Sequence, residues 1–269
     1  MIVLLSPAKS LNYAPVAEQA SQLVGLDHTL PYFVQQPAKL VAAARKLSAK
    51  KLSALMNISD DLAQLNVARF KAWQPKYSLE NSKQAVLAFD GDVYTGLQAS
   101  NLSVGDLNWA QSHLGILSGL YGVLRPLDLI QPYRLEMGSS LATKTGSIDH
   151  KNLYSFWDTQ ITAHLNQRLE ETKSDILVNL ASQEYFKSVK TAAFKAEVTE
   201  CVFEDEKNGT YKVISFFAKQ ARGMMARFII VNRITTPAKL KKFNLAGYAF
   251  DANASTELRL VFRRKQYAN

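Results

Sequence analysis

Three short apolar segments, each followed directly by a polar turn, most constrain the fold of this chain. Ile2 to Leu5 precedes Ser6 to Lys9, Ala85 to Phe89 precedes Asp90 to Tyr94, and Ile176 to Ala181 precedes Ser182 to Lys187. Runs that are apolar on both faces are typical of central strands covered by helices. If these strands are parallel neighbours, their polar ends meet at one sheet edge, the usual binding crevice of open α/β sheets.

The segments between and after these runs indicate helices and hairpins. Ser103 and Asp106 form a capping signal for a helix over 107–114, and helical spacing continues over 38–47 and 153–169. Asn208-Gly209 predicts a hairpin turn between 197–203 and 211–217. We also expect 248–250 and 258–262 to form a second antiparallel pair. We therefore predict a mixed α/β (α+β) fold, with a central sheet of parallel and antiparallel strands covered by helices, in one domain spanning 1–269.

Composition narrows the class of protein. The 269 residues are 47% hydrophobic and 20% charged, which excludes a wholly disordered, collagen-like or coiled-coil chain. The single cysteine, Cys201, excludes an internal disulfide and any cysteine-based metal cluster. The four histidines lie far apart in sequence, so we predict no metal site and no cofactor. No apolar run approaches the ~18 residues of a membrane span, and we expect a cytoplasmic monomer.

The distribution of charged residues along the chain is more informative than the net charge. The whole chain carries +9, and the stretch from Lys207 to Phe250 contains no Asp or Glu. Its nine cations are Lys207, Lys212, Lys219, Arg222, Arg227, Arg233, Lys239, Lys241 and Lys242. Clustered Lys and Arg bind phosphate backbones through counterion release. The alternative is a solvated basic surface that keeps the protein soluble.

The same stretch contains a predicted amphipathic helix over about 216–233. Helical spacing places Phe217, Ala221, Met224, Phe228 and Val231 on one apolar stripe. Lys219, Arg222 and Arg233 fall on the opposite arc and Arg227 on the flank, a row that could follow a phosphate backbone. Gly223 costs about 1 kcal/mol in a helix, which points to close approach by another backbone or a ligand. An ordinary amphipathic surface helix is the alternative.

Residues 51–73 read as two short helices around a tight turn capped by Ser59. This pattern resembles a helix–hairpin–helix element, which grips DNA phosphates through backbone amides. The glycines usual in that hairpin are absent, and Asp60 with Asp61 would repel phosphate. An ordinary helical hairpin is therefore the alternative.

The segment 118–138 is dense in Gly, Pro, Tyr and Arg, which predicts a fixed, irregular backbone. Arg125 and Arg134 could bind phosphate bidentately. They could equally pair with Asp128 and Glu136 and hold the loop together.

Two lysines follow predicted strands, Lys9 after the first and Lys187 after 176–181. A lysine desolvated in a crevice can act as a base or a Schiff-base nucleophile, with Asp92 or Glu184 as its acid/base partner. The alternative is that both lysines are plain cations lining an anion-binding cleft. The common nucleotide-binding, esterase and zinc-protease motifs are absent.

Five stretches in order along the chain resemble the YaaA family of bacterial peroxide stress proteins: Ser6 to Leu11, Phe89 to Leu97, Leu117 to Gly138, Asn179 to Lys187 and Phe217 to Met224. The resemblance implies a cytoplasmic protein linked to hydrogen peroxide stress and to limiting unincorporated iron and oxidative DNA damage. It also implies a mixed α/β fold with a basic cleft, a helix–hairpin–helix element and DNA binding.

The leading hypothesis is a stress protein that binds duplex or distorted DNA in a basic cleft. The expected DNA-contacting residues are Lys9, Arg125, Arg134, Lys187, Lys219, Arg222 and Arg227. The second hypothesis is an enzyme acting on a nucleobase, nucleotide or damaged DNA, with Lys9 or Lys187 as nucleophile or base. The third is direct iron sequestration, which the scattered histidines do not favour.

Overall fold

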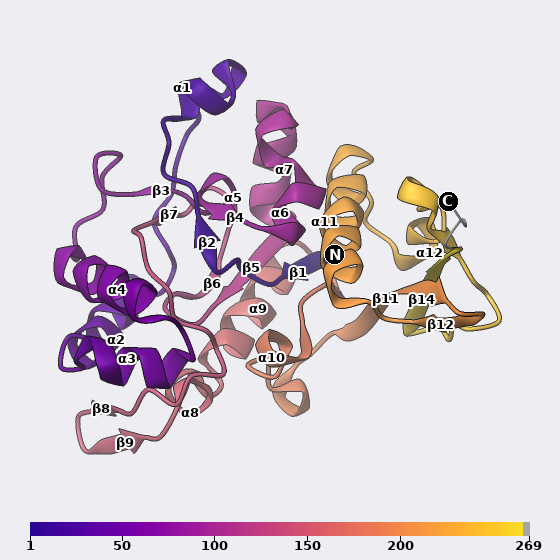
Figure 1. The fold of residues 1–269 in the computed structure, drawn as a ribbon. Coiled ribbons are helices and arrows are strands. Elements are labelled where there is room, and N and C mark those ends of the chain that lie inside the picture. Colours follow the sequence, from indigo (N-terminus) through magenta and orange to yellow (C-terminus); the bar gives the residue numbers. More distant parts are fainter. Residues whose placement is uncertain (266–269) are drawn as a thin grey trace.

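An eight-stranded sheet crosses the middle of the computed structural model, which describes residues 1–265 apart from the side chains of Ala17 and Gln19 (Figure 1). Its order is β13 (Ala249–Phe250), β14 (Arg259–Arg264), β11 (Glu197–Lys207), β10 (Ile176–Asn179), β1 (Ile2–Leu5), β5 (Leu114–Ser118) and β6 (Gly122–Leu124), and β12 (Thr210–Lys212) pairs with β11. The strands from β14 to β5 run parallel, whereas β6, β12 and β13 are antiparallel additions. The predicted mixture of parallel and antiparallel pairing is confirmed.

The first and third apolar runs form adjacent central strands. All four residues of β1 are buried, and β1 pairs with β10 in parallel with Val3 opposite Val178. A strand in the middle of a helix-covered sheet has no solvent face, which explains why the sequence shows a continuous apolar run instead of alternation.

The second run, Ala85 to Phe89, is not a strand of this sheet, so that prediction is wrong. Residues Ala85–Ala88 form the single helical turn α5, whose amides at Ala85 and Val86 bind the carbonyls of Asp128 and Pro126. Only β4 (Phe89–Asp90) is extended, and it pairs with β2 (Ser10–Leu11) in a separate ribbon. A short run buried on all sides fits a buried helical turn as well as a strand, so periodicity cannot distinguish them.

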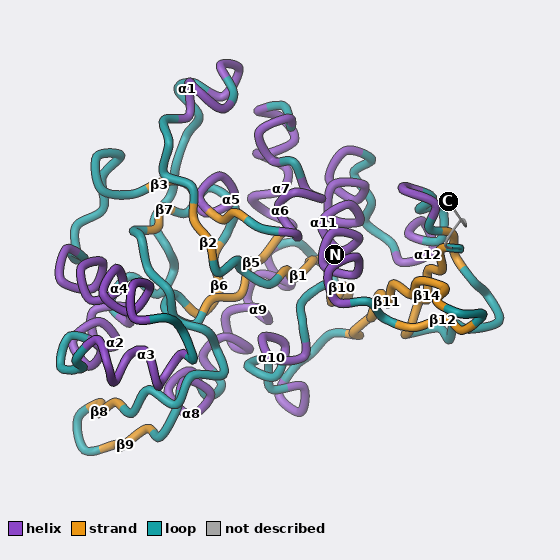
Figure 2. Tube along the Cα trace, viewed as in Figure 1, coloured by secondary structure: helices purple, strands orange, loops and turns teal. Residues whose placement is uncertain are grey.

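Helices lie on both faces of the sheet (Figures 1 and 2). On one face are α6 (Asp92–Leu97), α7 (Val104–His113) and α11 (Ser215–Val231), and on the other are α8 (Leu153–Trp157), α9 (Gln160–Glu171) and α10 (Gln183–Phe186). A separate group beside β6 comprises α2 (Gln36–Ala44), α3 (Ala49–Met56) and α4 (Asp60–Ala72). The smaller elements are α1 (Val16–Gln19), η1 (Ser21–Leu23), η2 (Ala99–Asn101), η3 (Thr191–Ala193), α12 (Pro237–Leu240), η4 (Leu245–Gly247), and the ribbons β3 (Lys83–Gln84) with β7 (Leu129–Ile130) and β8 (Thr143–Thr145) with β9 (Ile148–His150).

Capping and turn residues in the sequence correctly predicted the ends of several elements. Ser103 and Asp106 form the expected capping box at the start of α7. Asn208 and Gly209 both have positive φ, 57° and 75°, in the turn between β11 and β12, the backbone that this hairpin type requires. The predicted pairing of 248–250 with 258–262 appears as β13 and β14.

Two helical predictions need correction. The pattern over 153–169 is two helices, because Asp158 adopts φ 40° and ends α8 before α9 begins. On α11 the buried stripe is rotated from the predicted one. Ala221 is buried as predicted, together with Ala218, Met225 and Ile229, whereas Val231 is 49% exposed. The helix packs against α6 as well as the sheet, so its contact surface is wider than a single stripe and is rotated from the aromatic positions.

The glycine in α11 allows a close helix crossing, as the sequence predicted. A Cβ placed on Gly223 would overlap the carbonyl oxygen of Val93 in α6. A Cβ placed on Gly96 of α6 would likewise overlap the carbonyl oxygen of Gln220 in α11. The two backbones therefore touch directly, and only glycine fits at either position.

Among the described residues, no helix combines the length and the apolar character that crossing a lipid bilayer requires.

Candidate functional site at the edge of the sheet

The carboxyl ends of β1 and β10 lie side by side at one edge of the sheet, and we refer to this location, where open α/β sheets bind ligands, as the crevice. The backbone amide of Ser182 donates to Oγ of Ser6 at 2.9 Å, which joins the two strand ends. The chain leaves β1 toward β5 on one side of the sheet and leaves β10 toward β11 on the other. Ligands of open α/β sheets bind where neighbouring connections diverge in this way.

Glu136 is the centre of the charged side chains in this crevice. Its Oε1 lies 3.0 Å from Nε of Arg134 and 3.7 Å from Nζ of Lys9. Its Oε2 is buried and has no hydrogen-bond partner among the described residues. Two of the predicted DNA-contacting cations thus share one carboxylate. The sequence suggested the Arg134–Glu136 pair from its spacing but gave no signal that Lys9 joins it.

Glu184 and Lys187 lie on the other wall of the crevice. Oε1 of Glu184 accepts a hydrogen bond from the amide of Gly138 at 2.9 Å, which ties α10 to the loop that carries Glu136. The ammonium of Lys187 lies 5.2 Å from the ring centroid of Tyr154, a cation–π distance. Glu184, expected as an acid/base partner of a strand-end lysine, forms no ion pair with Lys9 or Lys187 among the described residues and instead holds the loop.

Asp92 pairs with Lys219 instead of a strand-end lysine. The two side chains come within 3.8 Å, from the first turn of α6 and from α11. This contact joins two of the five stretches that resemble the YaaA family, yet it offers Lys9 no acid partner. Glu136 takes that place.

Buried phenols lie next to the strand ends that border the crevice. Tyr94 donates to the carbonyl of Ser6 at 3.2 Å, and Tyr133 shares a 2.6 Å hydrogen bond with Ser118 at the end of β5. Burial raises the pKa of Tyr94, Tyr133 and Tyr185 above the ordinary value, because water is excluded from the charged form. These groups are therefore neutral hydrogen-bonding hydroxyls near neutral pH.

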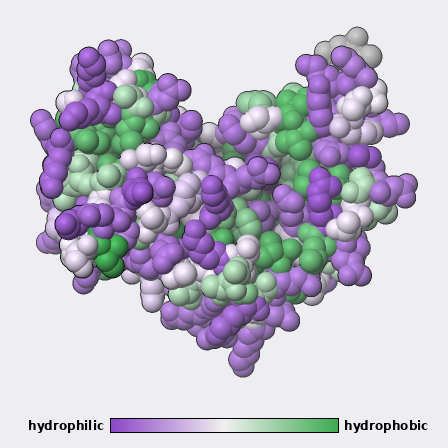
Figure 3. Space-filling model, turned by 90° about the horizontal axis from the view of Figure 1, so that it is seen from below, coloured by the Kyte–Doolittle hydropathy of each residue, from purple (hydrophilic) through white to green (hydrophobic). Residues whose placement is uncertain are grey.

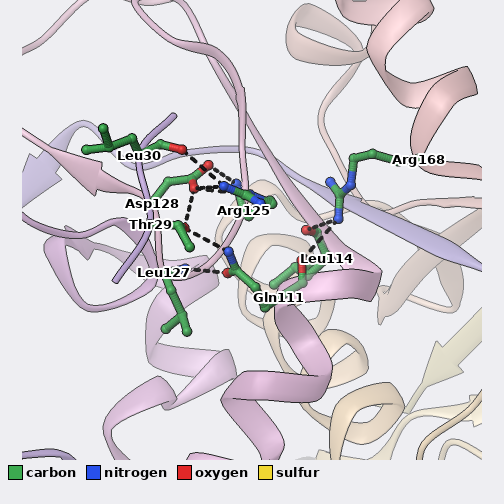
Figure 4. A network of polar contacts seen from close by, with 8 residues as sticks. All are labelled: Thr29, Leu30, Gln111, Leu114, Arg125, Leu127, Asp128 and Arg168. Carbon is green, nitrogen blue, oxygen red and sulfur yellow. Dashed lines mark hydrogen bonds and ion pairs between the residues drawn. The ribbon is translucent and has the colours of Figure 1, made fainter. Parts of the chain in front are cut away.

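Arg125 lies at the opposite edge of the sheet, in an internal network (Figure 4). Its Nη2 donates to Oδ1 of Asp128 at 2.9 Å and to the carbonyl of Leu30 at 3.1 Å. Asp128 also accepts from Thr29 at 2.6 Å, and Gln111 extends the network. The reason for the separation from Arg134 is that β6 runs antiparallel to β5, so its carboxyl end lies at the amino edge of the parallel strands.

The cations of α11 differ in their partners. Arg227 donates to the carbonyls of Leu97 and Gln98 at 3.2 and 2.9 Å, and so caps the end of α6. Burial lowers the pKa of Arg222, opposed by the charge of Glu200. Arg222 makes no hydrogen bond or ion pair through its side chain with any residue in 1–265. Of these two guanidiniums, only that of Arg222 is available for a ligand.

The predicted helical pair over 51–73 is present as α3 and α4. Asn57 ends α3 with φ 50°, and Ser59 accepts a hydrogen bond from the amide of Leu62 to cap α4. Asp60 and Asp61 occupy the first turn of α4. The two-helix geometry is confirmed, whereas a phosphate grip by this hairpin stays a prediction.

Figure 3 shows a hollow between two lobes, one at the side of α2, α3 and α4 and the other at the C-terminal strands. The C-terminal lobe, which we define as β11 to β14 with α12, carries exposed lysines. None of these forms an ion pair with a described residue: Lys207, Lys212, Lys239, Lys241 and Lys242. At the crevice, in contrast, Lys9 and Arg134 contact the carboxylate of Glu136, and Lys187 lies over the ring of Tyr154. A uniformly basic cleft therefore stays a prediction.

Within the part of the chain that the structure describes, no group of three or more His, Cys, Asp or Glu side chains is placed to hold a metal ion. Cys201 is buried, and burial raises the pKa of its thiol. Direct iron sequestration thus finds no candidate ligand set in these residues.

Comparison with known proteins places this chain in a family. Residues 1–254 match the family model described as peroxide stress protein YaaA. A UPF0246 protein of Paracidovorax citrulli is 57% identical over 266 residues, 98% of this chain and 99% of the relative. A UPF0246 protein of Verminephrobacter eiseniae is 57% identical over 269 residues, covering both chains completely. With a match of this extent and relatives of this identity, the chain belongs to the YaaA family of peroxide stress proteins.

Proposed function

We propose that this protein acts in the peroxide stress response by binding DNA, with the phosphate contacts made by the C-terminal lobe. The observation that carries the proposal is the set of five exposed lysines without ion-pair partners in residues 1–265, within a stretch that has no acidic residue. Unpaired surface cations release counterions when they meet phosphates, whereas cations already held by carboxylates gain little. Among the predicted contacts on α11, Arg222 has no side-chain hydrogen bond or ion pair with a described residue, whereas Lys219 is paired with Asp92.

This proposal revises the expected set of DNA contacts. Arg125, Arg134 and Arg227 hold Asp128, Glu136 and the end of α6, so we assign them to the scaffold. Lys9, Lys187 and Lys219 remain candidates at the crevice. Binding would be governed by phosphate contacts and DNA shape, without base reading. In the cytoplasm, such binding would protect DNA when peroxide and unincorporated iron are present.

The test is fluorescence anisotropy with duplex, bulged and abasic DNA over a salt series, with heparin as a competing polyanion. We expect submicromolar binding at low salt, a steep salt dependence and tighter binding to distorted DNA than to heparin of equal charge. Weak binding that is equal for all polyanions would reduce the lysine set to a generic basic surface.

A second function, catalysis at the crevice, is favoured by one observation: the Oε2 atom of Glu136 is buried and unpartnered beside Lys9. A carboxylate with an unused acceptor next to an amine suits proton transfer to a bound nucleobase or sugar. Lys9 itself is 68% exposed and lacks the apolar enclosure of a nucleophilic lysine. Borohydride trapping on abasic DNA, with Lys9→Ala and Lys187→Ala as controls, decides whether a lysine forms a Schiff base.

Iron limitation is tested separately, by Fe(II) titration of the purified protein. We expect no stoichiometric site, so that any effect on iron passes through DNA or another partner. One tight Fe(II) per chain would contradict this expectation.

A further inference from the structure

A pocket of about 850 Å³ is lined by residues of α4 and β3. Its walls are the C-terminal half of α4, the segment Leu23 to Leu26 after η1, and residues 79–84, with Tyr13 and Pro132 between them. The volume lies within the range of about 300–1,000 Å³ that small-molecule sites occupy. No residue that lines it belongs to the crevice at the sheet edge.

The pocket is apolar in its depth and also at its mouth. Leu23 and Trp73 are almost completely buried within its walls. Val24 and Leu79 also line it, yet they are 64% and 63% exposed, the most exposed of the large apolar side chains in the described residues. Two large aliphatic side chains that flank one opening provide a surface that an apolar ligand would remove from water.

The polar side of the pocket is cationic. Arg69 of α4 lines it, and the guanidinium makes no hydrogen bond or ion pair with any other residue between 1 and 265. Lys83 contributes a second positive charge, 6% exposed, whose ammonium binds the carbonyls of Asn12 and Ala14 at 3.1 and 2.8 Å. Among the described residues of the lining, the one carboxylate is that of Glu80, which is exposed. The pocket therefore offers an available arginine in a positive field.

Hydrogen bonds hold the walls in place without a ligand. The side-chain Nε2 of Gln84 donates to the carbonyls of Leu26 and Asp27 at 3.2 and 3.4 Å, which joins β3 to the segment after η1. Oε1 of Gln131 accepts from the amide of Gln74 at 2.9 Å, which fixes the chain just after α4. A preformed pocket avoids the entropic cost of ordering loops on binding.

We propose that this pocket binds a small organic anion with an apolar or aromatic body, whose carboxylate, sulfonate or phosphate group lies against Arg69. The apolar body would lie between Leu23, Trp73 and the exposed pair Val24 and Leu79. Burial lowers the pKa of Arg69, and the charge of Arg134 adds to this effect while Tyr13 opposes it. A bound anion would compensate the partly desolvated guanidinium. The proposal does not depend on DNA binding.

The first experiment titrates the full-length protein with two fluorescent dyes of similar size. One is 8-anilinonaphthalene-1-sulfonate, an aromatic anion, and the other is the neutral N-phenyl-1-naphthylamine. We expect saturable binding of one anionic dye per chain. Arg69→Gln should lower the affinity for the anionic dye by about tenfold, because it removes one charge-assisted contact. The same substitution should change the affinity for the neutral dye by less than about twofold. The matched control Lys71→Gln removes an exposed charge from the same helix outside the pocket and should change neither.

The second experiment fills the pocket. Ala68 lines it from the exposed face of α4, so Ala68→Trp should abolish saturable binding of both dyes and leave the urea-unfolding midpoint close to the wild type. Ala72→Trp is the substitute if the first variant unfolds. Absence of a saturable anionic-dye site in the wild type, equal affinity in Arg69→Gln, or unchanged dye binding in the filled variants would each overturn the proposal.

Discussion

At the scale of single residues, the partner of a charged side chain decides its role. Arg125 and Arg227 look like phosphate ligands in the sequence, yet the structure commits them to Asp128 and to the carbonyls at the end of α6. Lys239 and its neighbours look the same in sequence but have no ion-pair partner in the described residues. Charge can be counted from a sequence, whereas partners depend on tertiary contacts across many positions. This is why only part of the candidate site could be predicted.

Arg125→Met tests the structural role of this guanidinium. Asp128 is 1% exposed at its side chain and would lose its charged partner, while Arg125 itself is 34% exposed. Removal of one member of a largely buried pair leaves an uncompensated charge, and partial solvation reduces that cost. We expect the free energy of unfolding in urea to fall by about 1–3 kcal/mol, with an unchanged salt dependence of DNA binding. The exposed Arg259→Met is the control; a variant as stable as wild type would contradict the assignment.

His164 makes stability depend on pH. Burial, together with the charges of Arg168 and Arg125, lowers its pKa from 6.5 to about 4. As the pH falls, this histidine is therefore protonated in the unfolded chain before it is protonated in the folded chain. The resulting contribution to the free energy of unfolding is complete above about pH 7 and is lost as the pH drops from 6.5 toward 4. Between pH 7.5 and 5 the loss should be about 2 kcal/mol.

The matched variant is His164→Phe, which keeps a ring stacked on Tyr32 and cannot titrate. Its unfolding free energy should lose about 2 kcal/mol less than the wild type over that pH interval. Identical pH dependence in the two proteins would show that His164 is charged or solvated in the fold.

At the scale of elements, the crossing of α6 and α11 joins two parts of the chain that the sequence had singled out separately. The cost of glycine inside a helix predicted a close approach at Gly223, and the approach is real. The sequence did not identify Gly96 as its partner, because no local pattern shows which distant segment of backbone packs against Gly223. The capping signal at Ser103 and the turn signal at Asn208 predicted the structure correctly. The geometry of a helix cap or a tight turn depends on residues that are close in sequence.

Gly223→Ala tests this crossing. The added methyl group would overlap a backbone carbonyl, which cannot move as a flexible side chain can. We expect a loss of about 1–3 kcal/mol in the free energy of unfolding, despite the better helix propensity of alanine. Gly105→Ala on α7 is the control, because its Cβ would meet nothing nearer than Oγ of Ser103 at 3.8 Å. Its stability should be equal to or above the wild type; equal effects of the two changes would disprove a direct backbone contact.

At the scale of the whole molecule, the sequence predicted the class of fold and the gathering of strand ends, but not the separation of charge. β1 and β10 meet as expected, and Ser6 contacts Ser182. The segment 85–89 was misplaced because burial on all sides erases periodicity. Lys9 and Arg134 at the crevice share the carboxylate of Glu136, whereas five exposed lysines of the C-terminal lobe have no ion-pair partner in the described residues. The fold creates this difference, which charge counting along the sequence does not show. We therefore expect the crevice to recognise a small polar group and the lobe to hold the polyanion.

The most direct test is the salt slope of DNA binding in Lys239→Gln/Lys241→Gln/Lys242→Gln, compared with the wild type and with Lys144→Gln/Lys151→Gln, which removes exposed charge around the distant β8–β9 ribbon. Each phosphate contact contributes roughly 0.9 to the slope of log Kobs against log salt. We predict that the slope falls by roughly 2–3 in the triple variant, with weaker binding at every salt concentration, and stays unchanged in the control. An unchanged slope in the triple variant would contradict the proposed binding surface.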